Sequence, residues 1–207
     1  MLTTYELRWF SSGTIPENIE TWFKQNCLIN PMQLPEQRED VYLYSPKCDF
    51  LGIKLRQGRL EVKWRKAQLG AVGFGDFVEG KAEKWSKWLC CDDTEETFQP
   101  NLVMGNSSWV NVQKVRYSQL YQVLPEFPPQ PVCADEHIEN GCTVELTHLI
   151  IQGNAWWSLA FEASGEDACL MENLQTTASW VFDTYRELKL LAVNSYAFPS
   201  WLALVHQ

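Results

Sequence analysis

The 207-residue sequence predicts an α+β protein built on an antiparallel β-barrel, or tunnel, of about eight strands with flanking helices. Three observations lead to this fold class. Charged and apolar residues alternate along several segments, as they do in strands with one polar and one apolar face. Such segments outnumber helical ones and do not alternate with them as parallel βαβ units would. A closed barrel suits these strands because its interior can be polar while its outer faces pack against helices.

The clearest alternation lies in two neighbouring segments, Gly52–Gln57 and Arg59–Lys66. The residues on the charged faces are Lys54 and Arg56 in the first segment and Glu61, Lys63 and Arg65 in the second. The Gln57-Gly58 step between the segments is short enough for a hairpin turn, and glycine tolerates the φ angle that such a turn often needs. The two segments therefore predict adjacent antiparallel strands that present charge on one surface.

The other predicted strands show weaker versions of the same pattern. They are Thr3–Phe10, Asp40–Ser45, Asp76–Cys90, Ser107–Val123, Gly141–Ile151 and Asn154–Ala163. The last two form a second hairpin that turns at Gln152-Gly153-Asn154. Along Asp76–Cys90 the charges of Glu79, Lys81, Glu83 and Lys87 alternate in sign, and we expect these residues to pair with one another on the surface.

Two segments have helical spacing, Pro16–Asn26 and Glu166–Leu191. A proline followed by an acidic residue suits the first turn of the first helix. The segments expected as loops are Asn30–Gln37, the glycine-rich Gly70–Gly75 and the proline-rich Pro125–Pro131, and the acidic Asp92–Glu96 is expected to be a loop or a single helical turn. The tail Asn194–Val205 is apolar enough to pack on the body. No linker divides the chain, which favours one domain over residues 1–207.

Composition limits the class of function. The formal net charge of -9 argues against binding nucleic acid through phosphate neutralisation, although it permits a local basic site. No run approaches the ~20 apolar residues of a membrane span, and the first residues lack the features of a signal peptide. We therefore expect a cytoplasmic protein without a membrane partner. The seven Cys show no C-x-x-C spacing, and the three His do not lie at zinc-ligand spacing with them.

The basic residues on the predicted strands have two interpretations. They are Lys54, Arg56, Lys63, Lys114 and Arg116. Basic side chains on strands are commonly solvated, so these could form an exposed sheet face. Their repetition on the charged faces of successive strands favours instead an inward-facing site for an anion. Arginine binds phosphate oxygens through two parallel hydrogen bonds and lysine acts as a mobile point charge, which suits a polyphosphate.

Taken in order, these motifs resemble the CYTH superfamily, also called triphosphate tunnel metalloenzymes. Its members include thiamine triphosphatases, class IV adenylate cyclases and RNA triphosphatases, and their fold is an eight-stranded antiparallel tunnel. Thr4-x-Glu6-x-Arg8 stands where the family has its opening E-x-E-x-K strand. The motifs Lys54-x-Arg56 and Glu61-x-Lys63 match the family's hairpin, and Lys114-x-Arg116 resembles its later basic strand. Glu145 lies on the strand that follows, and Glu162 stands in the place of the closing E-x-E pair.

The resemblance implies roles for these residues. Phosphate oxygens would be held by Arg8, Lys54, Arg56, Lys63, Lys114 and Arg116, and a Mg²⁺ or Mn²⁺ ion by Glu6, Glu145 and Glu162. Thr4 and Ala160 replace one carboxylate of each family pair, which weakens the expected metal site. The same glutamates would otherwise serve as ion-pair partners that keep the lumen near neutral, because unpaired buried charge is costly.

Three functional hypotheses follow. The first is an enzyme that hydrolyses a triphosphate or polyphosphate with a divalent metal. The second is a catalytically inactive tunnel that binds a small phosphorylated molecule or another organic anion. The third is a protein-interaction module whose tunnel has lost its ligand. The sequence singles out no catalytic side chain, and loss of metal ligands would bear directly on turnover because phosphoryl transfer depends on charge neutralisation.

Overall fold

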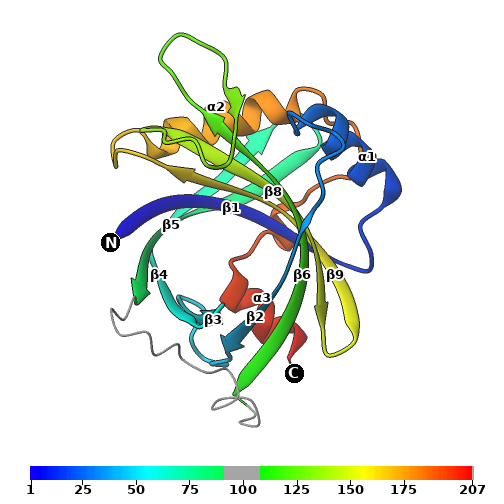
Figure 1. The fold of residues 1–207 in the computed structure, drawn as a ribbon, viewed down its shortest axis with the longest axis vertical. Coiled ribbons are helices and arrows are strands. Elements are labelled where there is room, and N and C mark those ends of the chain that lie inside the picture. Colours follow the sequence, from blue (N-terminus) through cyan, green and yellow to red (C-terminus); the bar gives the residue numbers. More distant parts are fainter. Residues whose placement is uncertain (91–107, 207) are drawn as a thin grey trace.

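The computed structural model describes residues 1–90 and 108–206 and has the predicted α+β architecture. Within these residues, eight antiparallel strands close into a barrel with three flanking α-helices (Figure 1). The barrel strands are β1 (Leu2–Ser12), β2 (Glu36–Leu43), β3 (Leu51–Arg56), β4 (Arg59–Phe74), β5 (Val78–Cys90), β6 (Trp109–Gln122), β8 (Gly141–Ile151) and β9 (Asn154–Ser164). The remaining elements are α1 (Glu17–Asn26), the short strand β7 (Gln130–Val132), α2 (Leu170–Phe182), the 3-10 turn η2 (Ala192–Asn194) and α3 (Phe198–Val205).

The strands follow the order β2-β3-β4-β5-β1-β9-β8-β6, with every neighbouring pair antiparallel. Pairing of β2 with β6, from Glu36↔Arg116 to Leu43↔Trp109, closes the ring. Strand β7 pairs with the end of β6 that lies beyond β2. Closure gives each barrel strand a partner on both sides, which satisfies backbone groups that an open sheet would leave at its edges.

Both predicted hairpin turns are confirmed. Gln57 and Gly58 join β3 to β4 with φ angles of 49° and 75°. Gln152 and Gly153 join β8 to β9 with φ angles of 50° and 77°. Positive φ at both central residues is typical of type I′ turns, whose twist matches that of the paired strands.

The main hydrophobic core lies between the barrel and the helices α1 and α2, which lie together on one side of the ring (Figure 1). Leu7 and Trp9 contribute from β1, and Phe161 from β9. Phe182 of α2 packs edge-on against Trp9, with ring centroids 5.7 Å apart. These strand residues alternate with the charged ones, so the apolar faces of the strands point outward to the helices and the charged faces point into the barrel.

A second core fills one end of the barrel. It joins Trp201 and Leu202 of α3 to inward-facing apolar residues of four strands: Phe10, Tyr42, Val110, Val112, Leu149 and Ile151. Trp201 is fully buried and stacks on Phe10, with ring centroids 4.8 Å apart and planes 5° from parallel. The inward face of β1 thus changes from charged Glu6 and Arg8 to apolar Phe10, and α3 packs where the lumen becomes apolar.

The prediction of a loop over Gly70–Gly75 was wrong. Strand β4 continues to Phe74 and pairs with β5 as far as Phe74↔Val78. The pairing of β4 with β5 has two register shifts, at Arg65/Ala67 and at Gln68/Gly70. Gly70 adopts a φ of 94° at the second shift. Because Val72 and Phe74 pack against the main core, the segment stays in the sheet despite its glycines.

The helical predictions need two corrections. The helix predicted over Glu166–Leu191 covers only Leu170–Phe182, because the chain then turns back and Leu190 exchanges backbone hydrogen bonds with the start of β5. The tail packs on the body as expected but forms a third helix, α3, with Pro199 in its first turn. Helix α1 begins at Glu17, one residue after the predicted start, because Pro16 retains an extended conformation.

The acidic segment Asp92–Glu96 lies outside the described residues. Within the described ranges, no helix is both long and apolar enough to span a membrane.

We expect Trp201→Ala to lower the free energy of unfolding by about 3–5 kcal/mol, because it empties the centre of the second core. Trp180→Ala is the matched control, since Trp180 lies on α2 with 51% of its surface exposed. It should change stability by about 0.5 kcal/mol or less. Urea denaturation of both variants measures the difference. Equal losses would show that α3 does not stabilise the barrel.

Candidate functional site

The inward faces of the barrel strands surround a cavity of about 360 Å³. All six predicted phosphate-binding residues and all three predicted metal-binding glutamates line it. Its basic residues are Arg8, Arg38, Lys54, Arg56, Lys63, Lys87, Lys114 and Arg116, and its carboxylates are Glu6, Glu61, Glu145 and Glu162. Asp40 in the wall and Glu36 at the rim pair with these same cations. Eight basic side chains therefore face six carboxylates, which leaves an excess of two positive charges on a chain whose net charge is -9. Strand closure therefore produces a cationic chamber inside an acidic protein.

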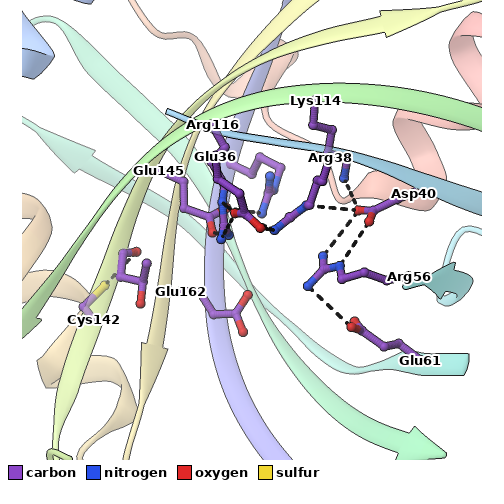
Figure 2. A network of polar contacts seen from close by, with 12 residues as sticks. Glu36, Arg38, Asp40, Arg56, Glu61, Lys114, Arg116, Cys142, Glu145 and Glu162 are labelled. Carbon is purple, nitrogen blue, oxygen red and sulfur yellow. Dashed lines mark hydrogen bonds and ion pairs between the residues drawn. The ribbon is translucent and has the colours of Figure 1, made fainter. Parts of the chain in front are cut away.

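Asp40 of β2 is the centre of the charge network on one wall of the chamber. Its carboxylate is fully buried and lies 2.9 Å from Nζ of Lys114. Arg56 donates to both oxygens, from Nε at 3.0 Å and from Nη2 at 3.3 Å, and Nε of Arg38 lies 3.6 Å away. Figure 2 shows the three cations converging on this carboxylate. Burial opposes ionisation of Asp40, but Lys114 and Lys54 hold its pKa well below the usual range.

Lys114 lies between this carboxylate and an aromatic wall. Its Nζ also donates to the hydroxyl of Tyr42, and the Tyr42 hydroxyl donates to Asp40 at 3.2 Å. The same ammonium lies 4.1 Å from the ring centre of Phe198, which stacks on Tyr42 at 4.4 Å. Burial, together with the neighbouring charge of Lys54, lowers the pKa of Lys114 well below that of an ordinary lysine.

Glu145 of β8 is held by two arginines. Arg116 donates to its Oε1, and Nη2 of Arg8 lies 3.6 Å from its Oε2. Although burial raises the pKa of Glu145, Arg116 and Arg8 outweigh that effect and lower it to about 2. Arg116 extends the network to Glu36 at the rim, 2.6 Å from its Nη2 (Figure 2).

Glu61 of β4 connects three of the lysine and arginine side chains. Its carboxylate lies 2.9 Å from Nζ of Lys54, 3.4 Å from Nη1 of Arg56 and 3.6 Å from Nζ of Lys87. Lys54 and Glu61 face each other across the β3–β4 hairpin, as the alternation in the sequence predicts. Burial and the charge of Arg56 nevertheless lower the pKa of Lys54 to about 8.

The ammonium of Lys63 lies between two of the glutamates predicted to hold a metal. It pairs with Oε1 of Glu6 and lies 3.2 Å from Oε2 of Glu162. Glu6 and Glu162 are direct partners on the adjacent strands β1 and β9, so their carboxylates enter the chamber side by side. Thr4, which replaces the first glutamate of the opening motif, donates its hydroxyl to Glu6 at 3.0 Å.

These carboxylates fit a resident metal ion poorly as they are arranged. Glu6 and Glu162 share Lys63, and Glu145 is paired with Arg116 and Arg8. Across residues 1–90 and 108–206, no group of three or more His, Cys, Asp or Glu side chains is placed to hold a metal ion. The observed arrangement is the ion-paired alternative for these glutamates, and binding of Mg²⁺ or Mn²⁺ stays a prediction.

Three charged residues of the chamber were missed from the sequence. Arg38 and Asp40 share the inward face of β2, but the predicted strand began at Asp40 whereas β2 begins at Glu36, so Arg38 fell outside it. Lys87 was expected to pair on the surface with the other charges of its strand. Instead, Lys87 lies near Glu61 in the chamber.

The other charges of β5 differ from one another. Glu83 pairs with Arg65 at 3.0 Å. Glu79 and Lys81, which share this strand face, are exposed. The strand leaves the lumen at its beginning, so one alternating pattern contains both surface and interior positions.

Arg38 has an unused donor inside the chamber. Its side chain is only 8% exposed, and its Nη1 donates to Glu36. Its buried Nε makes no hydrogen bond to any described residue, although Asp40 lies within ion-pair distance. A buried donor without a hydrogen-bond partner is costly, and an anion in the cavity would supply an acceptor.

No protein-family model matches this sequence, and no curated protein matches it. Among solved structures, the chain is similar to the PH1819 protein from Pyrococcus horikoshii OT3. The two share 13% sequence identity and a TM-score of 0.46, over 98% of this chain and 97% of that one. Similarity at this level supports no inference about family, ligand or activity.

We expect Asp40→Asn to destabilise the protein by about 3–5 kcal/mol, because it leaves buried cations without their shared counterion. Asp135→Asn is the control, since Asp135 lies exposed in the loop after β7 and should change stability by about 0.5 kcal/mol or less. Chemical denaturation at neutral pH compares the two. A wild-type stability for Asp40→Asn would show that the cations do not depend on this carboxylate.

Proposed function

We propose that the barrel chamber binds a small phosphorylated anion such as a triphosphate or a short polyphosphate. The observation that carries this proposal is that eight basic side chains face only six carboxylates around a cavity of about 360 Å³. Charges inside a barrel are poorly screened by solvent, so like charges gathered there repel one another and an anion relieves the repulsion. A ligand with two or more negative charges matches that excess better than a monoanion.

The chemistry of the lining supports phosphate over other anions. Arg8, Arg38, Arg56 and Arg116 approach the cavity from four different strands. Planar guanidinium groups bind phosphate oxygens in pairs, and lysines add mobile point charges. Arg38 in addition has a buried donor without a hydrogen-bond partner among the described residues.

The size of the chamber supports a small ligand. A volume of about 360 Å³ lies at the lower end of the ~300–1,000 Å³ range of ligand pockets. Helix α3 packs into the apolar end of the barrel, so we propose that the anion enters from the opposite end. This arrangement favours a compact anion over a long polymer that would need to thread through.

The resemblance to the CYTH superfamily supports the same ligand class. The closed eight-stranded antiparallel barrel is the architecture that this resemblance implies, and we propose that the chain is a divergent member. Metal-dependent hydrolysis of the anion is the second candidate function. It is favoured by the side-by-side placement of Glu6 and Glu162, and release of inorganic phosphate in the presence of Mg²⁺ or Mn²⁺ would demonstrate it.

Inorganic tripolyphosphate is expected to raise the melting temperature of the protein, because a ligand that binds only the folded state stabilises it by mass action. Lys87→Met should weaken binding by roughly 10- to 100-fold, as loss of a charged hydrogen-bond donor typically does. Lys81→Met is the matched control, with the same charge change on the exposed part of the same strand. Calorimetric titration measures both. Absence of any binding, or equal effects of the two substitutions, would contradict the proposal.

Anion affinity should decrease as pH rises from about 7 to 9. The pKa of Lys54 is about 8, so its ammonium loses its proton in this range and the chamber loses a positive charge. Sulfate is the appropriate probe because its own charge does not change between these pH values. Lys54→Met should show weaker binding and a smaller dependence on pH. A sulfate affinity that stays constant in the wild-type protein would argue against a role for Lys54.

A further inference from the structure

Lys63 occupies the place in the chamber where two carboxylates could otherwise hold a cation. The side chain extends from β4, and its ammonium contacts Glu6 of β1 and Glu162 of β9. Mg²⁺ in proteins is often bound through only one or two carboxylates, with water and substrate phosphates completing its coordination. Glu6 and Glu162 alone would therefore suffice for such a site, and the group between them is an ammonium.

The pairing of Lys63 is built into the fold. Register on β1 and β9 places Glu6 directly opposite Glu162, and the hydroxyl of Thr4 orients the Glu6 carboxylate. Burial lowers the pKa of Lys63, but the charges of Glu162 and Glu6 raise it by a larger amount. The net shift of the pKa is therefore upward, and the side chain stays charged at neutral pH. The position is a fixed positive charge rather than a titrating one.

The other carboxylates that line the cavity are also neutralised by protein cations. Glu145 pairs with Arg116 and Arg8, and Glu61 pairs with Lys54 and Arg56. Asp40 and Glu36 pair with the same cations, and eight basic side chains still exceed the six carboxylates by two charges. The chamber can thus neutralise an anion with its own side chains.

We infer that Lys63 acts as a built-in cation, so that the chamber binds the metal-free polyanion in preference to its magnesium complex. This inference rests on the proposed anion-binding function. A bound Mg²⁺ reduces the negative charge of the polyanion by two and brings a hydrated cation next to Lys63. Both effects reduce the attraction between ligand and lining, and release of a strongly held hydration shell would add to the cost.

The first experiment titrates inorganic tripolyphosphate into the wild-type protein by calorimetry, in EDTA and in excess Mg²⁺. We expect binding in EDTA and at least about tenfold weaker binding in Mg²⁺, a difference typical of one strong charge interaction. If binding requires Mg²⁺ or Mn²⁺, the inference about Lys63 is overturned while the proposed anion site stands. If tripolyphosphate binds under neither condition, the proposed function itself fails.

The second experiment uses Lys63→Met, which removes the ammonium and leaves Glu6 and Glu162 facing each other. Metal-free binding should weaken, and Mg²⁺ or Mn²⁺ should now strengthen it, so the sign of the metal effect reverses. Lys54→Met is the matched control because it removes one positive charge elsewhere in the same chamber. It should weaken binding without producing a metal requirement. The same reversal in both variants would show that Lys63 has no special position.

Direct metal binding provides a measurement that does not depend on the anion. The electron paramagnetic resonance signal of free Mn²⁺ should be unchanged by the wild-type protein and reduced by Lys63→Met. The melting temperature of each variant establishes that it is folded before titration. Loss of the free Mn²⁺ signal with the wild-type protein, reversed by Glu6→Gln, would overturn the inference.

Discussion

Asp40 is fully buried on β2, and its two oxygens hold the ammonium of Lys114 and the guanidinium of Arg56. Removal of these charges from water is costly, and the cost is tolerable only because each of them has a close partner of opposite sign. The same constraint determines how every other charge enters the barrel. Carboxylates of the lumen are placed against cations, and the cations outnumber them.

That imbalance is the main functional feature of the structure. A lumen with equal numbers of acids and bases would be satisfied by its internal ion pairs alone. Here eight basic side chains face six carboxylates, four in the cavity lining together with Asp40 and Glu36, and an anion or solvent counterions balance the remaining charge. The buried Nε of Arg38 shows the same shortage of acceptors at a single atom. Internal ion pairs thus orient the cations, and the surplus charge makes them available to a ligand.

The apolar end of the barrel restricts where this chemistry takes place. On β1 the inward face passes from Glu6 and Arg8 to Phe10, and there Trp201 of α3 completes an aromatic stack. Water is excluded from that end, which weakens screening of the nearest charges. Lys114 lies at the boundary, against Phe198 on one side and Asp40 on the other. The helix therefore supports both the fold and the electrostatic environment of the chamber.

Local patterns in the sequence determined the positions of the strands and the residues on their charged faces. The alternation in Gly52–Gln57 and Arg59–Lys66 predicted a hairpin with charge on one face, and all six predicted basic residues line the cavity. The prediction succeeds because successive side chains of a strand point to opposite faces. Residues two positions apart in the sequence therefore share a face. Spacing does not encode which face becomes the interior. The closed ring, with α1 and α2 outside it, decided that.

Contacts between distant segments were decided only by the tertiary structure. Lys81 and Lys87 belong to the same alternating pattern, yet one is exposed and the other lines the chamber, because β5 extends beyond the lumen. Lys63 and Glu162 form an ion pair although 99 residues separate them in the sequence. Asp40 pairs with Arg56 of β3 and with Lys114 of β6. The sequence by itself determined which residues could form a charged lumen. Only barrel closure decided which charges pair and which remain in excess, since pairing depends on strand register and on distance across the ring.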